Sequence, residues 1–307
     1  MISYERKKRK SRALGTGIPQ CLKKMGVYSV NILAGCAFEC AYCKFRARRF
    51  TSRNTVIIYS QIAQQLDEEL SALEAKGEKA RMVLFNTGTD AFCGNERVDK
   101  LALKSLETLF GHGVHVGITT RGIISESCLE LLRDQAHLTT ITYSLASTSE
   151  AFRRTFEPLV PPVEEQVKMM KTLTGSGLAV RGRIDPLIPM ENDATDQIEK
   201  LLGVYRSAGV REVVISYLHM LPEVANRLKS RINRVQASML SHWFRSPEGR
   251  MQRQLESKYR KQKYETIKES ATRMGMRALV CACRNADMYA GRCFLVPPRL
   301  DEQSTLL

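Results

Sequence analysis

The chain has 307 residues, 43% of them hydrophobic and 26% charged, a composition typical of soluble globular proteins that bury a sizeable core. No apolar run is long enough to cross a bilayer, and the opening MISYERKKRKSR lacks the apolar stretch of a secretory signal. We therefore expect a cytoplasmic protein without membrane contact, whose nine cysteines are ligands or free thiols rather than disulfides. The net charge of +15 favours a polyanionic partner such as nucleic acid.

Apolar β-type runs alternate with helical patterns through most of the chain. Six strands are predicted at residues 28–33, 82–86, 115–119, 140–147, 178–188 and 212–218. Five helices are predicted between them, at residues 60–76, 96–113, 125–134, 162–177 and 194–209. This alternation indicates the α/β class with parallel βα units, arranged either as a partial barrel or as an open doubly wound sheet.

The pattern changes after Pro222. Residues 223–275 are polar, basic and helix-rich around the only tryptophan, Trp243, and residues 277–300 have the pattern of a short strand pair. The sequence thus predicts three parts: a basic N-terminal tail (1–24), a βα region (25–221), and a basic helical extension with a C-terminal cysteine segment (222–307). We expect the basic tail to be disordered.

Three cysteines lie close together after the first predicted strand. Cys36, Cys40 and Cys43 form a Cys-x3-Cys-x2-Cys motif at the strand end where βα barrels have their active sites. Three thiolates can bind three irons of a [4Fe–4S] cluster and leave the fourth iron open to an outside ligand. A structural zinc needs a fourth ligand nearby, and the nearest histidine, His112, is far along the chain. The alternatives are a zinc loop with a remote fourth ligand and three unrelated buried thiols.

The motif, with Tyr42 directly before its last cysteine, resembles the signature of the radical S-adenosylmethionine (radical SAM) superfamily. In that superfamily the open iron chelates SAM, and an electron from the cluster cleaves the sulfonium to give a 5′-deoxyadenosyl radical. Further stretches resemble the branch of spore photoproduct lyase and DNA-repair-photolyase-like proteins. These stretches are NTGTDAFCGNE (86–96), GITTRG (117–122), YSLAS (143–147), FEPLVPP (156–162) and LTGSGLAVRGRIDPLIPMEND (173–193). The resemblance covers about residues 25 to 220 and implies a partial (βα)6 barrel of TIM type.

The resemblance also implies roles for residues at the matching positions. Cys36, Cys40 and Cys43 would bind the cluster, and a one-electron reductant such as flavodoxin or ferredoxin would supply the electron. SAM would be contacted by residues at the ends of several strands: Tyr42, Thr87, Gly88, Arg121, Ser144 and Arg183. The lyase has a hydrogen-donor cysteine shortly before its aspartate, where this chain has Thr87. Cys93, three residues after Asp90, is therefore a candidate catalytic residue together with Tyr42.

A second cysteine group lies near the C-terminal end. Cys281, Cys283 and Cys293 form a Cys-x-Cys-x9-Cys pattern that the resemblance does not explain. It is compatible with an auxiliary iron–sulfur cluster, with a zinc site, or with free thiols of which one donates hydrogen. The close Cys-x-Cys pair would place its two sulfurs on one face of a strand.

Three basic segments are candidates for binding nucleic acid: residues 6–12, 44–53 and 227–263. Arg46, Arg48, Arg49 and Arg53 follow the cysteine motif and would contact phosphates at the mouth of the site, where a flipped base would enter. Trp243, with Phe244 and Tyr259, offers aromatic surface for stacking. The alternative is that the C-terminal helices are solvated and amphipathic, with Trp243 in their core.

We therefore expect a radical SAM enzyme that acts on a thymine-derived DNA base, by lesion repair or by radical modification or rearrangement of a modified pyrimidine. The alternative within the same class is a peptide or tRNA substrate, with an auxiliary cluster at the C-terminal cysteines. A third alternative is a zinc-stabilised nucleic-acid-binding protein without catalysis.

Overall fold

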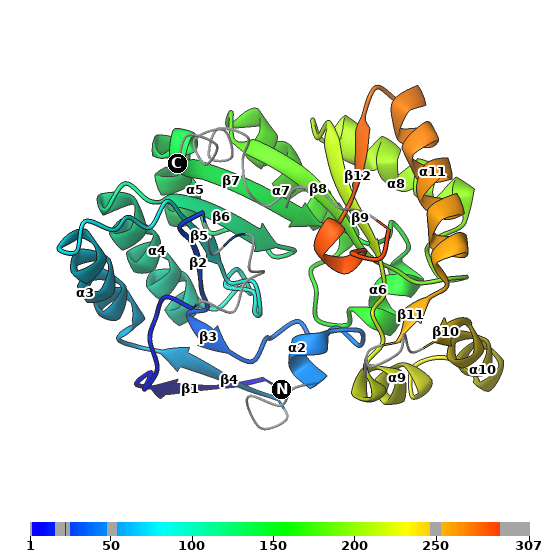
Figure 1. The fold of residues 1–307 in the computed structure, drawn as a ribbon, viewed down its shortest axis with the longest axis horizontal. Helices are drawn as coiled ribbons and strands as arrows, with labels where there is room; N and C mark the ends of the chain where they lie inside the picture. The colour runs from blue at the N-terminus through cyan, green and yellow to red at the C-terminus, as the bar shows by residue number, and fades with distance from the viewer. Residues whose placement is uncertain (1, 16–21, 23–24, 48–53, 246–252, 289–307) are drawn as a thin grey trace.

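A single parallel sheet organises the molecule. The structure is a computed structural model, and it describes residues 2–15, 22, 25–47, 54–245 and 253–288 (Figure 1). The sheet has seven strands in the order β12-β9-β8-β7-β6-β5-β2, and every neighbouring pair is parallel. None of the described helices has the length and apolar character that spanning a membrane requires.

The first six strands of this sheet confirm the sequence prediction. They are β2 (Val27–Val30), β5 (Met82–Phe85), β6 (His115–Thr120), β7 (Thr139–Ser144), β8 (Ala179–Leu187) and β9 (Glu212–Tyr217). Every residue of β5, β7 and β9 is buried. Such continuous burial is expected of parallel strands that are covered on both faces, and it explains why these segments are apolar runs rather than alternating patterns.

The five predicted helices are also present: α3 (Ile62–Glu74), α4 (Glu96–Gly111), α5 (Glu126–Asp134), α7 (Val163–Gly175) and α8 (Thr195–Ser207). With α11 (Ser257–Arg273) they form an arc around the curved sheet, in which α3 contacts α4, α4 contacts α5, and α8 contacts both α7 and α11 (Figure 1). The expected α/β class and partial barrel are confirmed. A further helix, α6 (Glu150–Phe156), is not evident from the sequence pattern.

The C-terminal segment differs from the expectation of a strand pair. Its one described strand, β12 (Arg277–Val280), pairs with β9 in parallel and becomes the seventh strand of the main sheet. The cause is α11, because a helix between two strands returns the chain to the same end of the sheet and makes the strands parallel. After Val280 the chain turns into the short 3-10 helix η2 (Ala282–Arg284).

The N-terminal basic run differs from the expected disordered tail over Ser3–Lys7. These residues form β1, which pairs in parallel with β4 (Thr55–Tyr59), and β4 pairs antiparallel with β3 (Leu33–Ala34). β3 occupies one edge of β4, and the N–H and C=O groups of its other edge form the hydrogen bonds that hold the polar strand β1 in place. Segments from outside residues 25–221 thus add one strand to each of two sheets.

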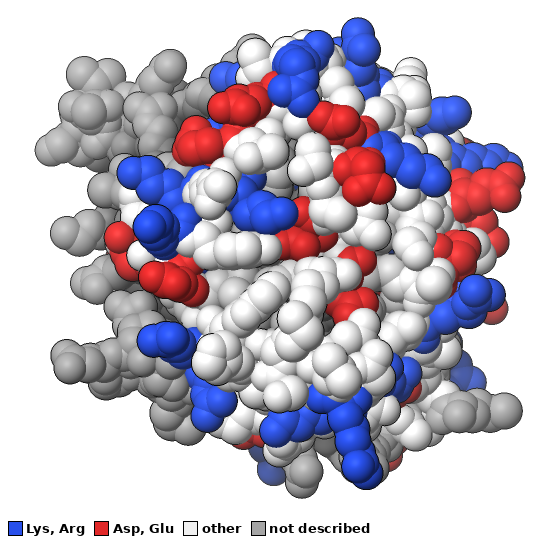
Figure 2. All heavy atoms as spheres, turned by 90° about the vertical axis from the view of Figure 1, so that its right-hand side faces the viewer, with Lys and Arg blue, Asp and Glu red and all other residues white. Residues whose placement is uncertain are grey.

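The helical extension consists of α9 (Pro222–Lys229), α10 (Arg234–Trp243), the short strands β10 (Phe244–Arg245) and β11 (Gln254–Leu255), and α11. The ring of Trp243 lies 5.9 Å from that of Tyr259 on α11, so the two aromatic side chains pack on each other. Figure 2, which views the right-hand side of Figure 1, shows Lys and Arg spread among Asp and Glu around a broad uncharged area. This face therefore fits solvated amphipathic helices better than a continuous basic surface.

Tyr205 of α8 fixes the ends of two central strands. Its hydroxyl accepts hydrogen bonds from the backbone N–H groups of Leu145 (2.8 Å) and Arg183 (3.2 Å). Gly182 leaves room for this ring, because a Cβ at that position would lie 2.6 Å from Tyr205. The buried phenol thereby sets the backbone positions of Ser144 and Arg183, which point toward the site described next.

Candidate active site

A pocket of about 520 Å³ opens at the C-terminal ends of the sheet strands. Its lining combines eleven of the residues predicted from the sequence: Cys36, Cys40, Tyr42, Cys43, Thr87, Gly88, Arg121, Ser144, Arg183, Cys281 and Cys283. The cysteine motif and the Cys281–Cys283 pair, which are far apart in the sequence, therefore line one cavity. The position of the cavity is the one expected for the active site of a βα barrel.

The cysteine loop forms one wall of the pocket. Its backbone is held by the Ala41 N–H, which donates to the Phe156 carbonyl at 2.8 Å, and by the Cys43 N–H, which donates to the Cys40 carbonyl at 3.1 Å. Burial and the Asp90 carboxylate raise the pKa of Cys36, and burial raises the pKa of Cys40 to about 12 although Arg121 acts in the opposite direction. These thiols are therefore protonated without a metal, and metal binding would release their protons.

Within the described part of the chain, no three His, Cys, Asp or Glu side chains converge on the position of a single metal ion. A cubane cluster distributes its cysteine ligands over separate irons, so it asks for thiols around a shared cavity rather than around one point. The three thiols of the loop meet that description.

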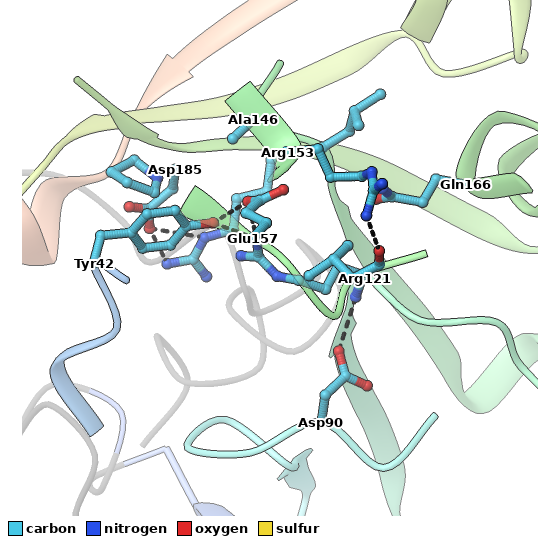
Figure 3. Close-up of polar contacts among 12 residues, drawn as sticks. Tyr42, Asp90, Arg121, Ala146, Arg153, Glu157, Gln166 and Asp185 are labelled. Carbon is cyan, nitrogen blue, oxygen red and sulfur yellow. Dashed lines mark hydrogen bonds and ion pairs between the residues drawn. The ribbon is translucent and has the colours of Figure 1, made fainter. Parts of the chain in front are cut away.

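Tyr42, Arg121 and Glu157 form a buried network behind the loop (Figure 3). The Tyr42 hydroxyl donates to Glu157, and Nη1 of Arg121 donates to both. Burial raises the pKa of Tyr42, which keeps the phenol a donor. Burial alone would lower the pKa of Arg121, but nearby Tyr42, Cys40 and Glu157 raise it, so the guanidinium stays charged. Arg121 lines the pocket, with part of its hydrogen-bonding capacity already used by Glu157.

Glu157 is a site residue that the sequence interpretation did not single out. Its side chain is 4% exposed and pairs with Arg121, whose side chain is 16% exposed. The available signal was the Glu-Pro pair in FEPLVPP, which lies just after the end of α6. The sequence pattern does not predict α6, and the end of this helix is what places the carboxylate behind the cysteine loop.

Asp90 anchors the end of β6. It accepts hydrogen bonds from the Thr120 hydroxyl (2.8 Å), the Arg121 N–H (2.9 Å) and the Phe92 N–H (3.1 Å). Figure 3 shows Asp90 beneath Arg121. Burial raises the pKa of Asp90, while these three donors act in the opposite direction. The aspartate therefore holds the backbone of Arg121 in place, independently of the side-chain contacts to Glu157.

Asn86, at the end of β5, has an unused donor. Its Oδ1 accepts from the Ile32 N–H (3.0 Å) and from the Thr89 hydroxyl (3.2 Å), which fixes the side chain. Its Nδ2 is buried and has no hydrogen-bond partner among the described residues, although Asn86 lines the pocket. A buried donor of this kind favours a bound polar group in the pocket. The sequence signal was a polar residue directly after a buried strand.

Gly88 leaves a shallow space in the same wall. A Cβ at this position would lie 3.3 Å from Asn31 Oδ1 and 3.4 Å from the Phe45 ring, so an added methyl group would fill the space without a severe clash. The Gly88 N–H donates to Asn31 Oδ1 at 2.8 Å, which fixes the loop after β5.

Two arginines share one carboxylate on the opposite wall. Nε of Arg183 lies 2.9 Å from Asp185 Oδ2, and Nη1 of Arg284 lies 3.3 Å from Asp185 Oδ1. Burial opposes ionisation of Asp185, but Arg284 and Arg183 outweigh it and lower the pKa of the carboxyl to about 2. Two guanidinium groups on this wall therefore share the negative charge of one carboxylate. Arg183 lines the pocket and is already paired with Asp185.

The Cys281–Cys283 pair, at the end of β12, lines the same cavity. The two thiols hydrogen bond to each other. The Cys281 N–H donates to the Ile215 carbonyl at 3.1 Å, and Asn285 Nδ2 donates to the Cys281 carbonyl at 2.9 Å. Asn285 is held in turn by the buried Arg260, whose Nη1 lies 2.7 Å from Asn285 Oδ1. Arg260 belongs to the basic segment predicted to bind nucleic acid, yet it points inward.

Several predicted site residues lie elsewhere. Cys93 is not among the described lining residues, and its thiol lies 3.7 Å from the Tyr4 hydroxyl on β1. Arg46 forms an ion pair with Glu39 of the cysteine loop. Cys293, Arg48, Arg49 and Arg53 fall outside the described residues, so their predicted roles stay predictions.

A family model of the radical SAM superfamily matches residues 30–202. Uncharacterized proteins of Mycobacterium tuberculosis and Mycobacterium bovis are 24% identical over 203 residues, which is 63% of this chain and 59% of theirs. The chain thus spans about three fifths of the length of these relatives.

Two solved structures are similar in fold. Spore photoproduct lyase complexed with dinucleoside spore photoproduct has a TM-score of 0.67 at 13% identity, with 90% of this chain and 81% of the lyase covered. A radical SAM methyltransferase from Sphaerobacter thermophilus has a TM-score of 0.54 at 15% identity, with 83% and 65% covered. A mutant of the lyase has been solved with bound AdoMet.

Proposed function

Because this chain belongs to the radical SAM superfamily, we propose that it cleaves SAM reductively in the pocket described above and uses the resulting radical to repair or modify a DNA base. The superfamily implies a [4Fe–4S] cluster and SAM. The observation on which the proposal chiefly rests is that three loop thiols and all six predicted SAM contacts line one cavity.

The residues present fit these groups. The buried loop offers three thiols, Asn86 Nδ2 is a donor without a partner among the described residues, and Gly88 leaves space beside it. Cys36, Cys40 and Cys43 would hold the cluster. SAM would lie against the ends of the strands, near Thr87, Gly88, Ser144 and Arg183. When bound, the cluster supplies the electron that cleaves the sulfonium of SAM.

The contribution of the chain itself is positioning and exclusion of water. Tyr42 and Glu157 tie the cysteine loop to the end of α6, and Asp90 fixes the end of β6. The cationic Arg121 suits a carboxylate ligand, and the Ser144 hydroxyl suits a ribose. Most of this wall is buried, which protects a reactive radical from solvent.

DNA is the proposed substrate because of the net charge of +15 and the similarity in fold to the lyase solved with a dinucleoside spore photoproduct. We favour a thymine-derived base. Thr87 occupies the place of the donor cysteine, which favours modification or rearrangement over the lyase reaction. Of the basic residues predicted to bind nucleic acid, Lys44 lines the pocket with its ammonium 5.1 Å from the centre of the Phe45 ring, Arg46 is paired with Glu39, and Arg260 is buried.

A peptide or tRNA substrate is the second candidate, and the Cys281–Cys283 pair favours it. An auxiliary cluster or a zinc ion at Cys281, Cys283 and Cys293 would face the reaction centre from the opposite wall. It would need Cys293 or another ligand from beyond the described residues, because two thiols are too few to complete a zinc site or an iron–sulfur cluster. If no metal binds there, the pair is placed to donate hydrogen.

The cluster needs a one-electron reductant of the flavodoxin or ferredoxin class. A reducing cytoplasm suits both this requirement and the free cysteines of the chain.

The test is anaerobic reconstitution with iron and sulfide, followed by dithionite, SAM and parallel panels of duplex DNA, tRNA and peptides. We expect 5′-deoxyadenosine, formed faster with a particular DNA. Faster formation with tRNA or a peptide instead would replace the substrate proposal and leave the radical chemistry in place. Absence of 5′-deoxyadenosine from protein with an intact cluster would contradict the proposed function itself.

A further inference from the structure

Arg227 of α9 contacts the backbone of the cysteine loop. Its Nε donates to the Ala41 carbonyl at 2.9 Å, and its Nη2 donates to the Cys43 carbonyl. The two contacts span the loop on either side of Tyr42 and connect residues more than 180 positions apart in the chain. The guanidinium thus holds, through backbone hydrogen bonds, the segment that contains the last two cysteines of the motif.

The helix that presents Arg227 is fixed to the protein core. Val224 and Leu228, on either side of Arg227 in the sequence, are buried, with exposures of 0% and 1%. Helix α9 also contacts α2 (Lys44–Ala47), which follows the loop directly. Arg227 is therefore held from behind by packing, and its half-buried side chain acts on the loop from a rigid support.

The charge of Arg227 acts on the same place. The Cys43 and Cys40 thiols are among the groups that interact electrostatically with the guanidinium. Arginine stays protonated in proteins, so a full positive charge lies beside two of the proposed cluster ligands. Reduction adds one negative charge to an iron–sulfur cluster, and nearby charge and hydrogen bonding set the potential at which it occurs.

We propose that Arg227 is a positioning residue for the cluster, which clamps the cysteine loop and shifts the reduction potential of the cluster to a less negative value. This inference rests on the proposed function and extends it to the role of the basic C-terminal extension. The electron comes from the external one-electron reductant, and no bond is made or broken at Arg227. The sequence predicts that the basic segment from Arg227 to Lys263 binds nucleic acid, but its first residue contacts the backbone of the cysteine loop.

The test compares Arg227→Gln, Arg227→Lys and the control Lys229→Gln, which removes an exposed positive charge from the same helix. Midpoint potentials are measured on reconstituted protein by redox titration followed by electron paramagnetic resonance. We expect a more negative potential in Arg227→Gln, a potential near that of the wild type in Arg227→Lys, and no shift in Lys229→Gln. Equal shifts in the Gln and Lys variants, or no shift in either, would overturn the electrostatic part of the proposal.

A second measurement uses protein without the cluster. Amide hydrogen exchange at residues 40–43 should be faster in Arg227→Gln than in the wild type, with other regions unchanged. Unchanged exchange in the loop would overturn the clamp. This measurement does not depend on iron, so it separates failure of the clamp from failure of the proposed function, in which the wild type would not bind a cluster at all.

Discussion

Tyr42 donates a hydrogen bond to Glu157 across 115 positions of the chain. The contact joins the cysteine loop to the end of α6, and Arg121 completes it from the end of β6. Three segments that are distant in the sequence thus meet in one charged network behind the loop. The Arg121 guanidinium is the counter-charge of the buried Glu157 carboxylate. The geometry of the cysteine loop therefore depends on this ion pair.

Glu157→Gln should destabilise the protein, because the buried Arg121 would lose its counter-charge. Breaking a buried ion pair by changing one partner costs about 3 kcal/mol. Urea unfolding followed by circular dichroism measures the change. The matched control is Glu96→Gln, whose pair with Lys100 is exposed to solvent and screened, so its loss should leave stability nearly unchanged. Equal losses in the two variants would contradict the role assigned to Glu157.

Cys40→Ala should abolish both cluster binding and SAM cleavage, because two thiols cannot hold three irons. Iron and sulfide analysis, with 5′-deoxyadenosine quantified in parallel, tests this. The control is Cys128→Ala, which removes a buried thiol of α5 away from the pocket and should leave both quantities unchanged. Persistence of the cluster and of cleavage in Cys40→Ala would overturn the motif assignment.

Gly88→Ala should weaken SAM binding with little effect on stability, whereas Gly122→Ala should mainly lower the stability of the fold. At Gly88 the new methyl group meets its neighbours at 3.3 Å or more, so stability should stay within about 1 kcal/mol of the wild type. It fills the space proposed for SAM, whose affinity should fall about tenfold, equivalent to about 1.4 kcal/mol. At Gly122 a Cβ would lie 1.7 Å from the Phe92 carbonyl oxygen, and the loss of stability should reach about 3 kcal/mol.

Thermal unfolding and calorimetric SAM binding measure the two glycine variants. If Gly88→Ala binds SAM as tightly as the wild type, SAM does not lie against this wall.

Replacing both Cys281 and Cys283 with alanine should lower the iron content per chain while SAM cleavage continues, because the thiols proposed to hold the SAM-cleaving cluster lie on the other wall. Iron content and 5′-deoxyadenosine are again the measurements, with Cys128→Ala as the control for loss of a thiol. Unchanged iron content would exclude an auxiliary iron–sulfur cluster, and unchanged zinc content as well would leave hydrogen donation as the proposed role of the pair.

His112 should make stability depend on pH. Partial burial opposes protonation, but hydrogen bonds with Asp67 and Glu74, each 2.9 Å long, raise the pKa of His112. The native state therefore binds this proton more tightly than the unfolded state. The stabilisation is complete below the ordinary pKa of 6.5 and is lost as pH rises through the higher native value.

The expected size is about 1 kcal/mol or less, because the two carboxylates are exposed. Unfolding free energies measured from pH 5.5 to pH 9 should show this decline in the wild type and a smaller one in His112→Gln. Identical profiles would contradict the assignment to His112.

The strands of the main sheet and the helices that cover it can be predicted from the sequence, because each has its own pattern of apolar and capping residues. Buried runs such as Met82–Phe85 are continuous apolar stretches, and α4 begins with Asn95, whose side chain accepts from the Arg97 and Val98 N–H groups. The cysteine motif is equally local. These signals suffice for the α/β class, the partial barrel and the position of the site at the strand ends.

The remaining features depend on contacts between distant segments. The parallel pairing of β12 with β9 follows from the docking of α11, and β1 becomes a strand only because β4 offers an edge. A run of basic residues predicts that their side chains contact solvent or phosphate. Arg227 and Arg260 instead donate to a carbonyl and an amide oxygen of the protein, which the basic pattern does not indicate. Asn86 and Glu157 are ordinary polar residues in the sequence, and only the fold brings Asn86 to the pocket lining and Glu157 to Tyr42 and Arg121 behind the loop.

The position of β12 has a consequence for the newly made chain. Synthesis proceeds from the N-terminus, so the cysteine loop leaves the ribosome long before residues 277–284 exist. The first six strands can pair while one wall of the cavity, with Cys281 and Cys283, is still missing. A nascent protein would thus leave the thiols proposed to hold the cluster accessible through an open side, which the seventh strand closes when it docks on β9.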